Sequence, residues 1–256
     1  MTPEQMAVSR YLKRHDLISF SPTAALIDMD GTLYDSMPRH ADAWYRLMTE
    51  EGVPCEHDEF FMYEGRTGRD TIRLLFKRAF GRDVTDEECE ALYLRKTQYF
   101  KELPDVSPMP GADRMIGEFM RRGITTVLVT GSGQRSLIDR LDRDYPGAFP
   151  AGMQITSRDV VHGKPHPEPY LRAMERAAAT PDSSIAVDNA PMGVLSGAES
   201  GAFTIGVTTG PIPEKELVDA GADIVYPSRG CLCFLTYSAC QYNCVGNSRT
   251  TINQEH

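Results

Sequence analysis

The chain has 256 residues, enough for one large domain or for a core with a smaller inserted domain. It is 41% hydrophobic and 25% charged, as in an ordinary globular protein, and its net charge of −9 argues against nonspecific binding of nucleic acid or anionic membranes. No apolar run reaches the length of a bilayer span and the first residues lack a secretion signal, so we expect a cytoplasmic protein.

Residues 3–16 have modest helical character and precede the first predicted core strand. Residues 25–36 read ALIDMDGTLYDS, in which a buried-strand pattern ends in Asp28 and Asp30. The carboxyl ends of strands form the ligand crevice of an open parallel sheet, and two like charges there need a cation, a shared proton or a chemical task. The alternative is an ordinary strand-end turn or a helix cap, because Asp-Gly pairs are common in turns.

After Ser36 the pattern becomes helical. Helices are predicted over 40–51, 58–63, 69–80 and 85–101, separated by segments that contain glycine. Thr85 and Glu88 match the capping-box pattern at the start of the last helix. Prolines at 104, 108 and 110 then mark the end of this helical block.

Strands and helices alternate in the remainder of the chain. Strands are predicted over 124–129, 153–156, 184–187 and 203–207, and helices over 112–121, 134–143, 167–179 and 192–200. This alternation predicts an α/β fold with a doubly wound parallel sheet. Because the helical block interrupts it after the first strand, we expect an inserted α-helical cap over the carboxyl ends of the strands. The predicted units are a core of residues 1–36 and 110–230, a cap of residues 37–109 and an irregular tail of residues 231–256.

The tail holds four of the six cysteines, at positions 231, 233, 240 and 244. Their spacing lacks the paired CxxC of structural zinc sites. We therefore expect free thiols in a polar tail rather than a metal knuckle.

Three further segments place polar residues at predicted strand ends. Thr130-Gly131-Ser132 offers a hydroxyl and backbone amides that suit phosphate oxygens, although such a sequence is also a common loop. Lys164 lies on a loop stiffened by prolines, where a solvated surface lysine is the alternative interpretation. Asp188 and Asn189 end another strand with the oxygen ligands that Mg²⁺ prefers.

Two acids, a hydroxyl, a lysine and an acid-amide pair, in this order and at strand ends, resemble the signature of the haloacid dehalogenase superfamily. The resemblance covers about residues 22–227 and implies a Rossmann-like core. More narrowly, the chain looks like the beta-phosphoglucomutase-like branch, which has a helical cap. Two segments, Glu64-Gly65-Arg66-Thr67-Gly68 and Asn189-Ala190-Pro191, resemble bacterial members of that branch that hydrolyse inorganic pyrophosphate.

The resemblance implies a role for each of these residues. Asp28 would be the nucleophile that forms an aspartyl-phosphate, and Asp30 would be the general acid and base. Thr130 would donate to the transferring phosphoryl group, and Lys164 would neutralise its charge. The carboxylate of Asp28, the main-chain carbonyl of Asp30 and the pair Asp188 and Asn189 would hold Mg²⁺.

The neutral Asn189 stands where many relatives carry a second acid, and Glu64 in the cap is a candidate to replace that carboxylate when the cap closes. The alternative is that Glu64 caps or flanks a helix. Six basic residues lie between positions 64 and 82, and many of them must face solvent. The substrate-binding candidates are Gly131, Ser132, Arg66, Thr67, Arg69 and His40. His40 matches a cap-hinge histidine of the mutases, but a surface histidine is the other interpretation.

Three functions fit these residues. The favoured one is a magnesium-dependent phosphohydrolase for inorganic pyrophosphate or a small phosphate ester. A phosphosugar mutase or a sugar-phosphate phosphatase is the alternative, and Gly68 stands where mutase caps often carry arginine, which disfavours the mutase. A noncatalytic binding module is disfavoured because every catalytic position holds a competent residue. We expect a small phosphorylated substrate, no nucleic-acid or membrane partner, and a monomer or weak oligomer.

Overall fold

The structure, a computed structural model, describes residues 1–132 and 138–227. Its centre is a six-stranded sheet in the order β3-β2-β1-β4-β5-β6, in which every neighbouring pair is parallel. The strands are β1 (Ala24–Ile27), β2 (Thr125–Val129), β3 (Gln154–Ile155), β4 (Ser184–Asp188), β5 (Phe203–Thr208) and β6 (Ile224–Pro227). The doubly wound parallel sheet predicted from the sequence is therefore confirmed.

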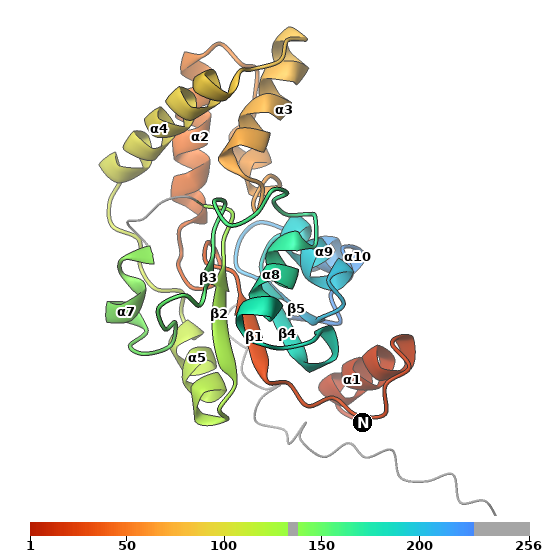
Figure 1. Cartoon of the computed structure of the whole chain (residues 1–256). Coiled ribbons are helices and arrows are strands. Elements are labelled where there is room, and N and C mark those ends of the chain that lie inside the picture. Colours follow the sequence, from red (N-terminus) through yellow and green to blue (C-terminus); the bar gives the residue numbers. More distant parts are fainter. Residues whose placement is uncertain (133–137, 228–256) are drawn as a thin grey trace, which may run out of the picture.

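Helices cover both faces of this sheet (Figure 1). One face carries α1 (Pro3–Arg14), α5 (Ala112–Arg121) and α7 (Leu141–Asp144), and the other carries α8 (Glu168–Arg176), α9 (Pro191–Glu199) and α10 (Glu214–Asp219). In β1, Ala25 and Ile27 face the first layer and Ala24 and Leu26 face the second. Burial on both faces explains why β1 reads as a continuous apolar run.

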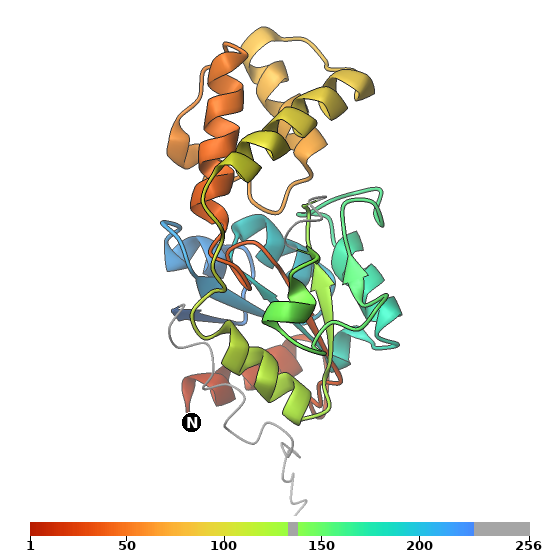
Figure 2. The ribbon, with the colours of Figure 1, turned by 90° about the vertical axis from the view of Figure 1, so that its left-hand side faces the viewer.

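A separate helical layer stands above one end of the sheet (Figure 2). It consists of α2 (Met37–Glu50), the 3₁₀ helix η1 (His57–Phe61), α3 (Gly68–Phe80) and α4 (Asp86–Glu102), and we call it the cap. An apolar cluster that includes Leu47, Ile72 and Leu75 fills the cap and continues into the core at Val194 and Leu217. The two connections to the core run side by side, because Tyr34 forms an antiparallel bridge with Pro108.

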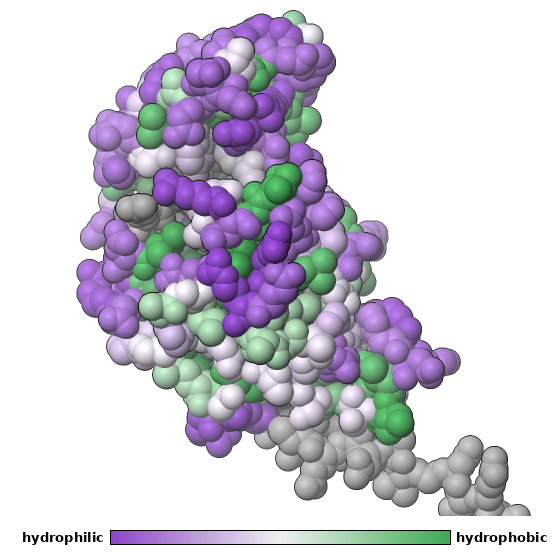
Figure 3. All heavy atoms as spheres, in the orientation of Figure 1, coloured by the Kyte–Doolittle hydropathy of each residue, from purple (hydrophilic) through white to green (hydrophobic). Residues whose placement is uncertain are grey.

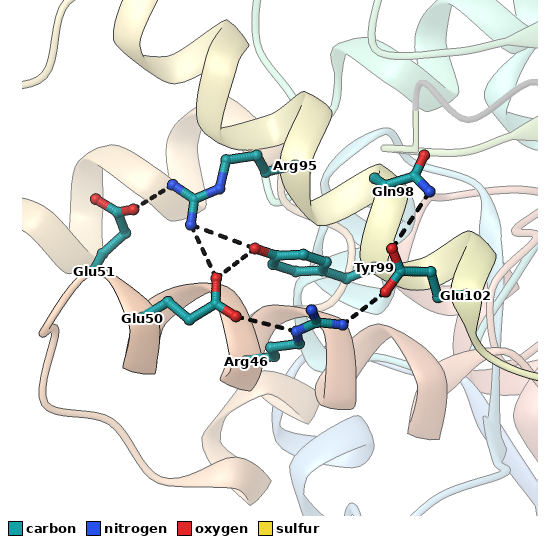
Figure 4. A network of polar contacts seen from close by, with 7 residues as sticks. All are labelled: Arg46, Glu50, Glu51, Arg95, Gln98, Tyr99 and Glu102. Atoms are coloured by element: carbon teal, nitrogen blue, oxygen red, sulfur yellow. Dashed lines mark hydrogen bonds and ion pairs between the residues drawn. The ribbon is translucent and has the colours of Figure 1, made fainter.

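An exposed polar network joins α2 to α4 in the cap (Figure 4). Arg46 donates to Glu50 and, at 2.8 Å, to Glu102, while Arg95 donates to Glu50 at 3.0 Å. The guanidinium of Arg46 lies 3.8 Å from the ring centroid of Tyr99, whose hydroxyl donates to Glu50. The network fixes the outer side of α4, whose inner side faces the site described below.

Several details differ from the sequence-based expectations. The sixth strand and α10 were not predicted, because residues 214–227 carry little periodic signal. The helix expected over 134–143 is described only in part: residue 138 and α7 (Leu141–Asp144) are helical, residues 139–140 form a turn, and residues 133–137 lie outside the described residues, as does the tail with its cysteines. The capping box of Thr85 and Glu88 is confirmed.

Among the described residues, no helix is long and apolar enough to cross a bilayer. On the face shown in Figure 3, hydrophobic residues are scattered among hydrophilic ones.

Candidate active site

The carboxyl ends of the central strands bring the predicted residues together. Asp28 follows β1, Thr130 follows β2 and Asp188 ends β4, and these three strands are neighbours in the sheet. Lys164 reaches the same point from the loop after β3. All four side chains are buried, so their charges and hydroxyls act in a region that water hardly enters.

Lys164 is the central cation of this site. Its Nζ donates to Asp28 Oδ1 at 2.6 Å, to Asp188 Oδ2 at 2.7 Å and to the carbonyl of Val129 at 3.1 Å. Burial opposes its charge, but Asp188 and Asp28 outweigh burial and raise the pKa of Lys164. The solvated surface lysine is therefore ruled out, and the ammonium is held as a permanent positive charge between two strand ends.

Asp28 keeps one carboxylate oxygen free of the protein. Its Oδ2 is buried and has no hydrogen-bond partner, whereas Oδ1 accepts from Lys164. Burial raises the pKa of Asp28 to about 8, Lys164 opposes this shift, and the nearby Asp188 and Asp30 add to it. An unpartnered buried oxygen at a strand end is poised for a ligand that the protein alone does not supply.

Asp30 is held by residues at the start of the cap. Its Oδ1 accepts from Ser36 Oγ at 2.6 Å and lies 3.0 Å from His40 Nε2. Burial favours the neutral acid, but His40 and Ser36 together outweigh burial and lower the pKa of Asp30. His40 is only 6% exposed, so the surface-histidine interpretation is wrong.

A buried lysine of the cap completes this chain of contacts. Lys96 Nζ lies 2.5 Å from His40 Nδ1, which places the proton of a neutral His40 on Nε2, toward Asp30. Burial and Lys96 lower the pKa of His40. Burial also lowers the pKa of Lys96 to about 8, against the attraction of Glu64 and Asp30. Lys96 and His40 thus couple α4 and α2 to the acid at the end of β1.

The loop that precedes α3 is closed over the core. A Cβ atom at Gly131 would lie 2.7 Å from the carbonyl oxygen of Gly65, and one at Gly163 would lie 2.6 Å from Thr67 Cγ2. Only glycine permits such close approach of the two units. Glu64 lines a cavity of about 30 Å³ in this contact, where burial, Asp30 and Asp28 raise the pKa of its carboxyl well above the usual range. Glu64 therefore faces the site and caps no helix.

The oxygen atoms at the strand ends fit Mg²⁺. Asn189 Oδ1 is buried without a hydrogen-bond partner just after β4, the strand next to β1, and oxygen atoms are the ligands that Mg²⁺ takes. Both oxygens of Asp188 are occupied, Oδ2 by Lys164 and Tyr170 and Oδ1 by the amide of Ala190. Within the described ranges, no group of three or more His, Cys, Asp or Glu side chains is gathered as a metal site. The ion would thus need Asn189, main-chain oxygen and water among its ligands.

The remaining candidates divide between the cavity and its surroundings. Gly131, Ser132 and Arg66 line the 30 Å³ cavity. Thr130 Oγ1 accepts from the amide of Ser132, so its own hydroxyl proton points elsewhere. Thr67 caps α3. Arg69 lies 3.3 Å from Asp86 on the exposed side of the cap and does not line this cavity.

Comparison with known proteins assigns the family. The model of haloacid dehalogenase-like hydrolases matches residues 22–201, more than half of the chain. The chain belongs to this hydrolase family.

Several known proteins are similar to most of the chain. A structure from Bacteroides vulgatus, assigned as a beta-phosphoglucomutase, superposes with a TM-score of 0.89 and 38% identity, over 93% of this chain and 99% of that one. The validoxylamine A 7'-phosphate phosphatase of Streptomyces hygroscopicus is 28% identical over 72% of this chain and 85% of its own length. The phosphorylated carbohydrates phosphatase of Thermotoga maritima is 27% identical over 78% of this chain and 91% of its own.

Two residues that contact the candidate active site of this haloacid dehalogenase-like hydrolase were not predicted from the sequence. Lys96 continues the buried spacing of Cys89, Leu92 and Phe100 on α4, so a charged residue on an apolar face was a signal that could have found it. Tyr170 donates to Asp188 Oδ2 at 2.6 Å and is fully buried. A tyrosine on the inner face of α8 looks like any core aromatic, and no sequence pattern marks its partner.

Proposed function

We propose that the chain is a magnesium-dependent phosphohydrolase that works through a phosphorylated Asp28. The observation that carries this proposal is the free Oδ2 of Asp28, which lies beside the lysine bridge and under the closed cap loop. A buried carboxylate oxygen without a protein partner is what an attacking nucleophile requires.

The residues divide the two steps between them. In the first step a carboxylate oxygen of Asp28 attacks phosphorus, the bond from phosphorus to the leaving oxygen breaks, and Asp30 gives that oxygen a proton. In the second step Asp30 takes a proton from water as the water oxygen attacks phosphorus, which releases phosphate and restores Asp28. Lys164 and Thr130 would stabilise charge on the phosphoryl oxygens.

The first step needs Asp28 as a carboxylate and Asp30 as a protonated acid. Without ligands, the pKa shifts of the two acids favour the opposite protonation states. The pKa of Asp28 is raised to about 8 and the pKa of Asp30 is lowered. When bound by Asp28, the Asp30 carbonyl and Asn189, with Asp188 and Glu64 nearby, Mg²⁺ would supply positive charge that favours the Asp28 carboxylate. A dianionic phosphate beside Asp30 would raise the pKa of that acid, so substrate itself prepares the proton donor.

Sugar phosphates are the proposed substrate class. Both relatives cited above are phosphatases of phosphorylated carbohydrates or a related compound by their names, and each covers more than two thirds of this chain. The test is phosphate release with Mg²⁺ from a panel of sugar phosphates, glycerol phosphate and pyrophosphate, with Asp28→Asn as the control. We expect turnover in the wild type and none in Asp28→Asn. Release of phosphate by Asp28→Asn at the wild-type rate would refute the nucleophile. Isomerisation of a sugar phosphate without phosphate release would favour a mutase.

Inorganic pyrophosphate is the second candidate, and the size of the closed site favours it. The cavity of about 30 Å³ is far smaller than a typical ligand pocket, and Glu64 lies against it. A carboxylate there would bring the missing negative charge to the metal and favour a small leaving group.

The test of this second candidate is the ratio of kcat/KM for pyrophosphate to kcat/KM for a sugar phosphate. Glu64→Ala should lower that ratio, and Asn189→Asp in the same variant should partly restore it. Glu64→Gln, which keeps the size and loses the charge, is the matched control. An unchanged ratio in Glu64→Ala would leave Glu64 without a part in substrate choice.

We propose that the core comprises residues 1–36 and 110–230 and that residues 37–109 act as its lid. The contacts of Gly65 and Thr67 with the core loops support a closed state of that lid.

A further inference from the structure

Two cavities of very different size meet at the edge of the cap. The smaller one, of about 30 Å³, includes Asp30 and Glu64 in its lining. The larger one, of about 350 Å³, lies between α3, α4 and the core loop at residues 157–161, and we call it the outer crevice. Gly68 and Tyr93 line both. These two residues therefore form the boundary between the candidate active site and a space more than ten times larger.

The ring of Tyr93 is fixed in that boundary. A Cβ atom at Gly68 would lie 2.2 Å from two ring carbons, so the ring packs directly on the glycine backbone. Its centroid lies 6.2 Å from that of Trp44, which also lines the small cavity. Tyr93 precedes Lys96 by one turn of α4, so the boundary and the Lys96–His40 contact belong to the same rigid helix.

The outer crevice has the chemistry of a site for a hydroxyl-rich group. Ser157 contributes a hydroxyl, and Arg158 contributes a guanidinium from the core side. Arg69 and Arg73 from the cap also line it, but both already pair with Asp86. Asp70 and Glu90 also line the crevice, so three positive side chains face two negative ones, which suits a neutral polyol better than a second phosphate.

We propose that Tyr93 sets the upper size of the leaving group. With the ring on Gly68, the phosphoryl site admits a short polyol or a phosphate as leaving group, and a hexose would have to pass through the ring into the outer crevice. This inference rests on the proposed phosphohydrolase function and narrows its substrate class. Tyr93 acts by exclusion and needs no contact with the reacting atoms.

The test removes the ring and compares substrates. We expect Tyr93→Ala to raise the ratio of kcat/KM for a hexose 6-phosphate to kcat/KM for glycerol phosphate by about tenfold or more, the scale on which pocket size discriminates. Tyr93→Phe keeps the ring and should keep the ratio within about twofold of the wild type. Leu94→Ala changes the next residue, whose side chain is 60% exposed, and should also leave the ratio unchanged.

A second measurement separates size exclusion from general damage. Inhibition by inorganic phosphate should have the same Ki in Tyr93→Ala as in the wild type, because the phosphoryl site itself is unaltered. If Tyr93→Ala fails to fold, Tyr93→Leu retains apolar bulk and should raise the ratio by a smaller factor. A ratio that stays at the wild-type value in the folded variant, or a Ki that rises together with it, would overturn the proposal.

Failure of this proposal can be distinguished from failure of the proposed function. If the wild type hydrolyses glycerol phosphate and the variant ratio does not move, only the role of Tyr93 is lost. If the wild type releases phosphate from no member of the panel with Mg²⁺ present, the phosphohydrolase function falls and the size limit falls with it.

Discussion

Tyr170 gives the sharpest test of how the buried charges are arranged. Its hydroxyl donates to Asp188 Oδ2, the oxygen that also accepts from Lys164. Tyr170→Phe removes one hydrogen bond to a buried carboxylate and keeps the ring, whose centroid lies 5.2 Å from Lys164 Nζ. A hydrogen bond to a charged group contributes about 1.5–3 kcal/mol. Without it, Asp188 would bind Lys164 more strongly and draw the ammonium away from Asp28.

The expected result is a fall in kcat/KM of about tenfold or more, since about 1.4 kcal/mol corresponds to one factor of ten. The measurement is phosphate release under subsaturating substrate, together with urea denaturation to record stability. Tyr11→Phe is the matched control, because Tyr11 is also fully buried and its hydroxyl donates at 2.8 Å to Gly201, far from the strand ends. It should lose stability and keep its kcat/KM. Wild-type kcat/KM in Tyr170→Phe would refute the view that Asp188 positions Lys164.

Three further outcomes are expected. Burial lowers the pKa of Lys96 from 10.5 to about 8, so the wild type should gain stability as pH rises between these two values, by up to about 1.4 kcal/mol per pH unit. Denaturation of Lys96→Met at each pH should show no such gain. Asp30→Ala should slow hydrolysis of alkyl phosphates much more than hydrolysis of an activated aryl phosphate, and equal losses would argue against its acid role. Arg95→Ala breaks exposed ion pairs with Glu50 and Glu51, so its effect on stability should be small and should vanish at high salt, with kcat/KM unchanged.

The strand ends were predictable because they depend on local pattern. An apolar run that ends in Asp28 or Asp188 predicts both a buried strand and a polar residue at its carboxyl end. Parallel pairing of the strands then brings these carboxyl ends together. The contact of His40 with Lys96 joins residues 56 positions apart, and no periodicity within one helix reveals such a partner. The orientation of the Arg69 side chain could not be predicted from the sequence either, because its pairing with Asp86 depends on how α3 and α4 pack.

The sequence shows the charges of the cap arginines, but it does not show which residues surround them in the fold. A basic run on a helix is usually solvated, and Arg73 and Arg78 indeed pair with acids on the exposed side of the cap. Tyr170 and Tyr93 are both tyrosines, and only the residues that surround them in the fold give them different roles. Aromatic side chains acquire such individual roles from tertiary packing, which a single sequence does not encode in a readable period.

The paired connections between core and cap have a consequence for the order of folding. Strands β1 and β2 are neighbours, with Ala24 opposite Thr125, yet about a hundred residues of chain separate them. A cap that forms first would bring Tyr34 and Pro108 together through their bridge and leave only short arms to close, which lowers the entropy lost in joining the two strands. The hypothesis is that cap helices nucleate assembly of the sheet. Pulsed hydrogen exchange would contradict this hypothesis if it showed that the amides of β1 and β2 become protected before those of α2 and α4.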